Sequence, residues 1–353
     1  MNKNKENYFI DFLRFIFSIS ILIYHGRFFS SNVDNALLKY GNLAVDFYFI
    51  VTGYLMINSI NKKKNNNNSS LIKETISFVY GKIKRIFPAL VLTFFVGIIF
   101  VYGKSFFLNP SLLIIKKVLP ELFQLGVFGC ELTINCSWWY ISAMLFTLLL
   151  LYPLARKFKS NYYKYIVPVI IIATLFLAFI VGMDIDSPLD KQFFLINGFY
   201  KALIFIPLGN ICFILTQKIS KCKFSKRQIT VLSILEIVIY ILIILNLQYL
   251  FIPKPIHAYL LMINVALTFS NFTYTSKLFK SSKWKKLGKY GFYIYLINTS
   301  IRIFTFDKFA HYGFTYIQLL IIFVSMTCFI AFIIYIIIEV LYKKIKNNIV
   351  KES

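Results

Sequence analysis

Long apolar stretches recur along almost the whole chain, and they restrict the fold more than any other feature. A helix needs about 20 mainly apolar residues to cross a membrane. The sequence offers ten such stretches, at residues 9–29, 43–60, 86–103, 138–154, 163–183, 198–216, 229–249, 256–275, 288–306 and 314–341. Only 15% of the 353 residues are charged, against about a quarter in soluble domains. We therefore predict an all-α integral membrane protein with about ten transmembrane helices.

The basic residues gather on one side of this alternating arrangement. Of the 39 Lys and Arg residues, 28 fall in the segments of one side, which include both termini, 10 fall on the other side, and Arg14 lies inside the first span. Cytoplasmic segments of membrane proteins carry such an excess, so both termini are predicted to be cytoplasmic. The net charge of +25 therefore indicates topology, with the lipid bilayer as the partner. We expect no nucleic-acid partner.

The chain reads as one membrane-embedded domain over residues 1–353. Residues 61–70, "NKKKNNNNSS", form a low-complexity segment that we interpret as a flexible cytoplasmic linker. The longest external connection contains the apolar stretch 110–126, which suits an interfacial helix or one that dips into the bundle. Cys130 and Cys136 in this connection fit either a small disulfide loop or two free thiols. No zinc-type cluster occurs, and we expect no metal.

Two ionisable residues share one face of the first span. Arg14 and His25 are eleven residues apart, which corresponds to about three helical turns and about 16 Å of rise. Arg14 lies near the inner end and His25 near the outer end. Ionisable groups in a membrane usually face a protein interior or a wet cavity. The simpler explanations are that Arg14 reaches the headgroups or pairs with Asp11, and that His25 lies at the outer interface.

The second span adds a carboxylate at the depth of His25. Asp46 lies about one turn below the outer end of this span, and a short connection makes the first two helices neighbours. A carboxylate beside an imidazole orients the ring and raises its basicity, as in a general-base pair. A purely structural Asp–His hydrogen bond is the alternative. Gly53 follows in the same span and permits close contact between helices.

Two cations precede the third span. Lys82 and Arg85 are three residues apart, so they share a face if this segment is helical, and Pro88 follows at a favoured early-helix position. Two cations at the cytoplasmic mouth suit a phosphate-bearing ligand. An ordinary basic flank of a membrane span is the alternative.

Taken in order, these residues resemble the integral-membrane acyltransferase family 3, whose members O-acylate cell-surface glycans. The resemblance covers nearly the whole chain. The matching motifs are Arg14 with His25, "AVDFYFIVTGYL" with Asp46 and Gly53, "KIKRIFP" with Lys82 and Arg85, "WWYISAMLFTLLLLYP", "FYIYLIN", and the late Glu339.

Three positions depart from the family pattern. Ala143 and Met144 stand where many members carry Glu, as in the subgroup typified by surface-antigen O-acetyltransferases and glucan succinyltransferases. Asn298 replaces the usual His, so no role that needs a titratable side chain transfers to it. Lys82 replaces an Arg, which keeps the charge and loses the bidentate fork.

The resemblance implies a membrane-bound O-acyltransferase of the bacterial inner membrane. Its donor substrate would be an acyl-CoA, most often acetyl-CoA, and its acceptor a hydroxyl of a polysaccharide or of a lipid-linked precursor. No permanently bound cofactor is expected, and the sequence does not specify an oligomeric state. The predicted CoA-binding residues are Arg14, Lys82 and Arg85.

The same resemblance implies roles for residues near the outer side. His25, oriented by Asp46, would take the proton from the acceptor hydroxyl, whose oxygen attacks the thioester carbonyl. Direct transfer and a route through an acyl-His intermediate both fit the sequence. The candidate acceptor contacts are Trp139, Tyr140, Tyr295 and Asn298.

A polytopic transporter or flippase for a glycan precursor is the main alternative, because it too has many helices with buried charges. Such proteins place polar or broken helices near the midplane, often in paired halves. Here Glu236 is the notable ionisable residue deep in a later span. A glycan polymerase or ligase would expose a large basic outer loop, and an assembly protein would not need Arg14, His25 and Asp46.

Overall fold

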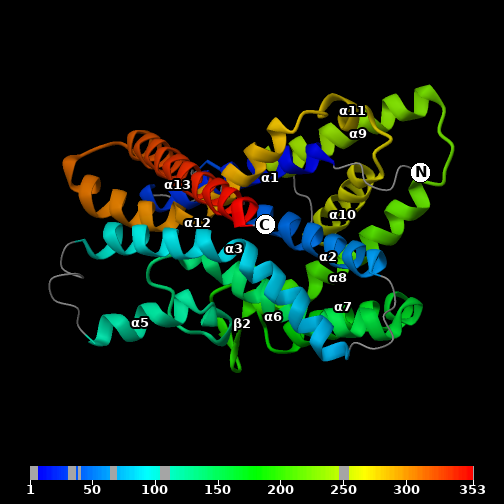
Figure 1. The fold of residues 1–353 in the computed structure, drawn as a ribbon, viewed down its shortest axis with the longest axis horizontal. Helices are drawn as coiled ribbons and strands as arrows, with labels where there is room; N and C mark the ends of the chain where they lie inside the picture. Colours follow the sequence, from blue (N-terminus) through cyan, green and yellow to red (C-terminus); the bar gives the residue numbers. More distant parts are fainter. Residues whose placement is uncertain are drawn as a thin grey trace.

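The computed structural model confirms an all-α architecture (Figure 1). It describes residues 7–30, 37–38, 41–63, 70–103, 112–245 and 254–352. The helices of these residues are α1 (Tyr8–His25), α2 (Ala44–Lys62), α3 (Leu71–Tyr102), α5 (Leu112–Leu122), α6 (Trp139–Phe158), α7 (Val167–Ile180), α8 (Asn197–Ile219), α9 (Lys226–Leu245), α10 (Lys254–Ser270), α11 (Tyr274–Leu278), α12 (Lys283–Phe309) and α13 (Tyr316–Glu352). Two short strands, β1 (Lys191–Gln192) and β2 (Leu195–Ile196), pair antiparallel.

Each of the ten predicted spans coincides with a helix. In the described part of the chain, eight helical segments are long and apolar enough to cross a membrane. The predicted span 256–275 corresponds to α10, whose apolar part is shorter. The predicted span 288–306 corresponds to α12, which is long but carries Lys289, Asn298 and Arg302 among its apolar residues. This helix is the least apolar of the long helices.

The largest difference from the prediction lies at the start of α3. This helix begins at Leu71 rather than near residue 86, because Ser70 caps it by accepting a hydrogen bond from the Lys73 backbone N–H at 3.2 Å. Pro88 therefore lies inside the helix. Glu74 in the first turn forms an ion pair with Arg156 of α6 at 2.9 Å, which fixes the extension to the bundle. In the predicted linker, residues 61 and 62 are the last two residues of α2 and residue 63 follows the helix. Residues 64–69 lie outside the described residues.

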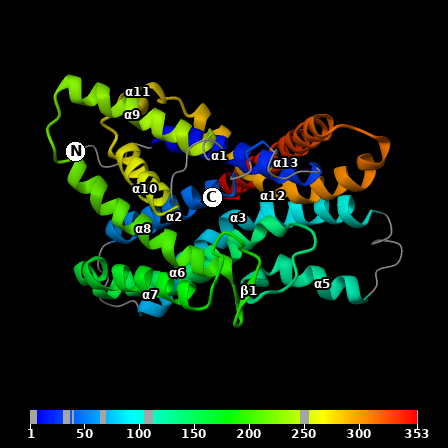
Figure 2. The same ribbon diagram turned by 180° about the vertical axis from the view of Figure 1, so that it is seen from behind.

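Different helix-to-helix turns lie at the two ends of the bundle (Figures 1 and 2). The turn between α12 and α13 lies at one end together with α5, and the turn between α8 and α9 lies at the opposite end. Gly26, directly after α1, lies against Leu320 near the start of α13, so α1 ends toward the first of these ends. Gly288 near the start of α12 lies against Asp11 near the start of α1, and Lys82 and Lys285 line the same cavity as Asp11, so these residues lie toward the second end. We call the first end outer and the second inner, following the predicted topology.

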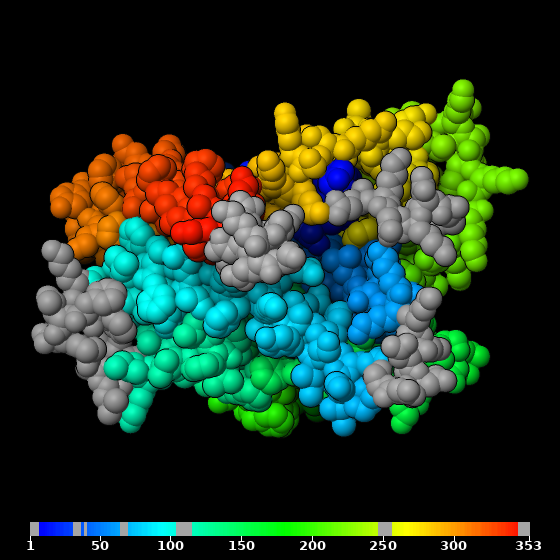
Figure 3. All heavy atoms as spheres, in the orientation of Figure 1, coloured from blue at the N-terminus to red at the C-terminus, as the bar shows by residue number. Residues whose placement is uncertain are grey.

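The surface of the bundle is largely apolar. In Figure 3, α3 runs along the visible face of the molecule. Its side chains Phe87, Phe95 and Ile99 are about half exposed. Large exposed apolar side chains of this kind are expected on a helix that faces lipid, so the outward face of α3 supports membrane insertion.

The helices α2 and α8 touch through glycines. A Cβ atom added at Gly53 would lie 2.0 Å from the carbonyl oxygen of Ile206, and one added at Gly209 would lie 2.0 Å from the carbonyl oxygen of Ile50. These distances leave no room for a side chain on either helix. The close helix contact expected at Gly53 is therefore a backbone-to-backbone crossing.

The helices α1 and α12 meet in a similar way. A Cβ atom at Gly288 would lie 2.7 Å from the carbonyl oxygen of Asp11, and one at Gly291 would lie 2.9 Å from the Cα atom of Phe15. This crossing places the inner half of α1 directly against the inner half of α12. Side chains that flank the crossing on either helix can therefore reach a common space.

We expect Gly53→Ala and Gly209→Ala to destabilise the protein by about 1–3 kcal/mol or more, because each forces the α2 and α8 backbones apart. The measurement is the thermal unfolding midpoint of the detergent-solubilised protein. Gly81→Ala is the matched control, because nothing lies within 4 Å of a Cβ atom at that helical position. An unchanged midpoint for both crossing variants would contradict the predicted contact.

Candidate active site

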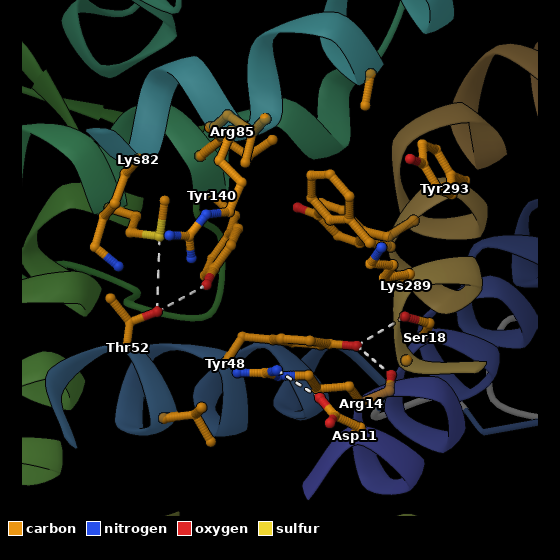
Figure 4. Close-up of a pocket in the computed structure, with 18 of the residues that line it drawn as sticks. Asp11, Arg14, Ser18, Tyr48, Thr52, Lys82, Arg85, Tyr140, Lys289 and Tyr293 are labelled. Atoms are coloured by element: carbon orange, nitrogen blue, oxygen red, sulfur yellow. Dashed lines mark hydrogen bonds and ion pairs between the residues drawn. The ribbon is translucent and has the colours of Figure 1, made fainter. Parts of the chain in front are cut away.

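A cavity of about 600 Å³ lies between α1, α2, α3, α6, α12 and α13 near the inner end (Figure 4). Its lining includes all three predicted CoA-binding residues, Arg14 from α1 and Lys82 and Arg85 from α3. Lys285 and Lys289 of α12 also line it. Residues from opposite ends of the sequence thus contribute five cations to one cavity, and sequence analysis identified three of them.

Two carboxylates lie among these cations. Asp11 forms an ion pair with Arg14 at 2.8 Å, and Glu339 of α13 forms one with Lys289, also at 2.8 Å. All four residues line the cavity. The pairing of Arg14 with Asp11 that the sequence allowed is therefore present, and it coexists with a position on the cavity wall. The lining has more positive than negative side chains, so it favours an anionic ligand.

Three tyrosines, Tyr48, Tyr140 and Tyr295, line the cavity and pack against one another. We call them the tyrosine triad. The ring centres of Tyr140 lie 6.0 Å from Tyr48 and 5.9 Å from Tyr295. The hydroxyl of Tyr48 donates to the carbonyl oxygen of Arg14 and lies 2.7 Å from the Ser18 hydroxyl. Figure 4 shows Tyr48 between the cations of α3 and the start of α1.

His25 lies beyond the tyrosine triad and does not line the cavity. Its Nε2 atom lies 3.2 Å from Oγ of Ser137. The backbone carbonyl of the same serine accepts a hydrogen bond from the Tyr295 hydroxyl. Trp138 donates from Nε1 to the Leu296 carbonyl at 3.0 Å, which holds this segment against α12. One serine therefore connects the imidazole to a tyrosine of the cavity wall.

The contacts of Asp46 differ from the expected pair with His25. Asp46 forms an ion pair with Lys201 of α8 at 3.0 Å, and Lys201 forms a second one with Asp186, also at 3.0 Å. Lys201 is only 2% exposed, and a buried ammonium group requires such partners. The carboxylate thus compensates a buried lysine, while Ser137 takes the position beside the imidazole. The sequence did contain a signal for this pairing, because Lys201 is the single charged residue of the predicted span 198–216 and a buried lysine needs an acidic partner.

The four candidate acceptor contacts separate into two groups. Tyr140 and Tyr295 line the cavity, and Tyr140 lies 3.4 Å from the Thr52 hydroxyl. Trp139 does not line the cavity. Its ring packs against Gly198, where an added Cβ atom would lie 2.4 Å from the ring. Asn298 is fully buried and donates from Nδ2 to the Tyr295 carbonyl at 2.6 Å.

Glu121 of α5 fixes the segment that leads to Ser137. Its carboxylate accepts hydrogen bonds from three successive backbone N–H groups, those of Thr133, Ile134 and Asn135, the first two at 3.0 Å. Glu121 is fully buried. Burial raises the pKa of this carboxyl to about 7, although the three hydrogen bonds act in the opposite direction. Sequence analysis did not identify this residue.

The cysteines of the external connection are free thiols. Cys130 and Cys136 are both partly buried, and no disulfide joins them. Of the two predicted alternatives, the structure has two free thiols rather than a disulfide loop. Across the described ranges, no group of three or more His, Cys, Asp or Glu side chains is arranged to hold a metal ion.

The order of these residues along the helices matches a known family. A model of acyltransferase family 3, described as an acyltransferase domain, matches residues 7–339. The chain belongs to this family. The match extends from the cap of α1 to Glu339 of α13, so it includes every residue placed at the cavity except Tyr342. No curated protein and no solved structure matches the chain. As a member of family 3, the protein is a multi-pass membrane acyltransferase.

We expect the stabilising effect of Glu121 to depend on pH. Because its pKa is raised in the folded protein, the stability it contributes is present below about pH 4.5 and is lost as the pH rises through about 7. The difference in melting temperature between the wild type and Glu121→Gln should therefore shrink across this window. Glu131→Gln is the control, since Glu131 is exposed and pairs with Lys117. A difference that stays constant with pH would contradict the assignment.

Proposed function

We propose that this family 3 member is an O-acyltransferase that moves an acyl group, acetyl in the simplest case, from acyl-CoA to a hydroxyl of a cell-surface polysaccharide or its lipid-linked precursor. The observation that carries the donor assignment is the convergence of Arg14, Lys82 and Arg85 on one cavity. Coenzyme A carries three phosphate groups, and Arg and Lys side chains bind phosphates through charge-assisted hydrogen bonds. The inner position of the cavity suits a donor that is made in the cytoplasm.

The mixed lining of the cavity also supports a donor with a charged end and an apolar arm. Besides the cations, its wall includes apolar and aromatic side chains, among them Val51, Leu55 and Ile86. The slim pantetheine arm would lie along these side chains and reach the tyrosine triad. In this arrangement the thioester approaches Tyr295, and Ser137 and His25 lie directly beyond it.

We propose His25 as the general base. Its imidazole takes the proton of the acceptor hydroxyl, and the acceptor oxygen attacks the thioester carbonyl carbon. The carbon–sulfur bond then breaks, and the imidazolium returns the proton to the CoA thiolate. Ser137 contacts Nε2 of this ring through its hydroxyl, and its backbone carbonyl accepts from the Tyr295 hydroxyl of the tyrosine triad. Asp46 contributes indirectly in this scheme, by compensating Lys201 in the neighbouring helix.

The acceptor would contact the tyrosine triad from the side of His25. Sugars pack on aromatic faces, and Tyr140 and Tyr295 offer both a ring and a hydroxyl at the cavity wall. We assign Trp139 and Asn298 to the support of these tyrosines, since Trp139 packs beside Tyr140 and Asn298 bonds to the Tyr295 backbone.

We expect His25→Ala to lower acyl transfer at least about 100-fold, because it removes the proposed base. The measurement is mass spectrometry of the surface glycan from a strain that carries the variant, with membrane expression checked by immunoblot. His311→Ala is the control, since His311 is an exposed residue after α12. Wild-type acylation in a well-expressed His25→Ala strain would contradict the role.

Removing the cations of α3 tests the donor site. Lys82→Ala and Arg85→Ala should each weaken CoA binding about tenfold, the effect of losing a hydrogen bond between charged groups. Isothermal titration calorimetry of CoA into the detergent-solubilised protein measures this. Lys84→Ala is the matched control, because Lys84 lies on the same helix, is exposed and does not line the cavity. Equal CoA affinity in all three variants would overturn the donor assignment.

A further inference from the structure

Two arginines contact one aromatic ring at the outer end. Arg27 lies in the 3-10 helix η1 (Gly26–Phe29), and Arg302 lies in α12. Their guanidinium carbons are 5.1 Å and 4.3 Å from the ring centre of Phe28. Arg27 also lies 4.0 Å from the ring centre of Tyr24. Stacking on aromatic faces fixes both guanidinium groups while leaving their N–H donors available.

Among the described residues, no carboxylate forms an ion pair with either arginine. The ion pairs found among the described residues include neither Arg27 nor Arg302. The Nε atom of Arg302 is buried and has no hydrogen-bond partner within the described ranges. A buried, unpaired donor on a cation is costly unless a ligand satisfies it.

The same two arginines lie close to His25, the proposed base. Arg27 follows His25 by two residues, and the ring of Phe28, which both arginines contact, follows His25 by three residues. Both arginines are partly exposed, and Phe28 is 49% exposed, so the group is open toward the outside. A ligand that binds them lies next to the imidazole.

The position of these cations is unusual for a membrane protein. Outer segments carry few basic residues. Two buried or partly exposed outer lysines are matched by carboxylates, since Lys201 binds two aspartates and Lys117 binds Glu131. Among the described residues Arg27 and Arg302 have no such ion pair, and both contact the ring of Phe28. An anionic ligand would supply the missing partner.

We propose that Arg27 and Arg302 form an outer anion site that holds a phosphate or carboxylate group of the acceptor beside His25, an inference that rests on the proposed acyl transfer. A lipid-linked sugar carries phosphate, and an acidic polysaccharide carries carboxylate. Two guanidinium groups bind either through bidentate hydrogen bonds. Such binding would bring a neighbouring acceptor hydroxyl within reach of the imidazole.

Inorganic phosphate is the probe, with the protein in phosphatidylcholine nanodiscs and saturating CoA in the inner cavity. Equilibrium binding of radiolabelled phosphate is measured for the wild type, for the double variant Arg27→Gln/Arg302→Gln and for Lys308→Gln. Lys308 is the matched control, an exposed cation near the outer end of α12. We expect the double variant to bind phosphate at least about tenfold more weakly, as loss of hydrogen bonds to a charged group predicts, with Lys308→Gln unchanged.

Folding is checked by the CoA affinity and the melting temperature of each variant, which should match the wild type. Equal phosphate binding by the wild type and a folded double variant would overturn the outer anion site. So would a CoA-saturated wild type that binds no phosphate. Failure of the wild type to bind CoA would instead overturn the proposed function. The difference in phosphate binding between the wild type and the double variant would still report on Arg27 and Arg302, because the inner cavity is the same in both proteins.

A second arm distinguishes the acceptor from a lipid headgroup, which offers the same phosphate chemistry. The titration is repeated in nanodiscs that contain phosphatidylglycerol. Unchanged phosphate binding supports a site for the acceptor. Loss of phosphate binding in these nanodiscs would assign the two arginines to an anionic lipid and overturn the acceptor assignment.

Discussion

Every ionisable side chain inside this apolar bundle has to be compensated, and the rest of the structure depends on how this is done. Lys201 is matched by Asp46 and Asp186, and the Glu121 carboxylate is matched by three backbone N–H groups. Such matched groups hold helices and loops in place. Where positive side chains outnumber their partners, at the inner cavity and at the outer end of α1, the structure offers binding sites for anions.

The helix α12 links these two regions. It lies against α1 through Gly288 and Gly291, and it contributes Lys285 and Lys289 to the inner cavity and Arg302 to the outer end. These polar residues are the reason that α12 is the least apolar of the long helices. A helix can carry them at membrane depth because its neighbours α1, α3 and α13 surround it.

Sequence-based predictions succeeded for residues that share a membrane face and failed for residues whose contacts join segments far apart in the chain. Arg14, Lys82 and Arg85 were predicted to share a site, and they line one cavity, because each lies near the same membrane face. Ser137 and Glu121 were not identified. Their contacts join an external segment to α1 and α5, and neither residue stands in a periodic pattern or a charge cluster that would mark it.

The sequence by itself determined a helical membrane protein with its basic residues on one side, because apolar length and charge are local properties of each segment. The ordered motifs likewise determined the acyltransferase family. Tertiary structure alone decided which buried groups become partners. Asp46 pairs with Lys201, and His25 lies beside Ser137, because these contacts depend on the distances between packed helices far apart in the chain, which no local pattern specifies.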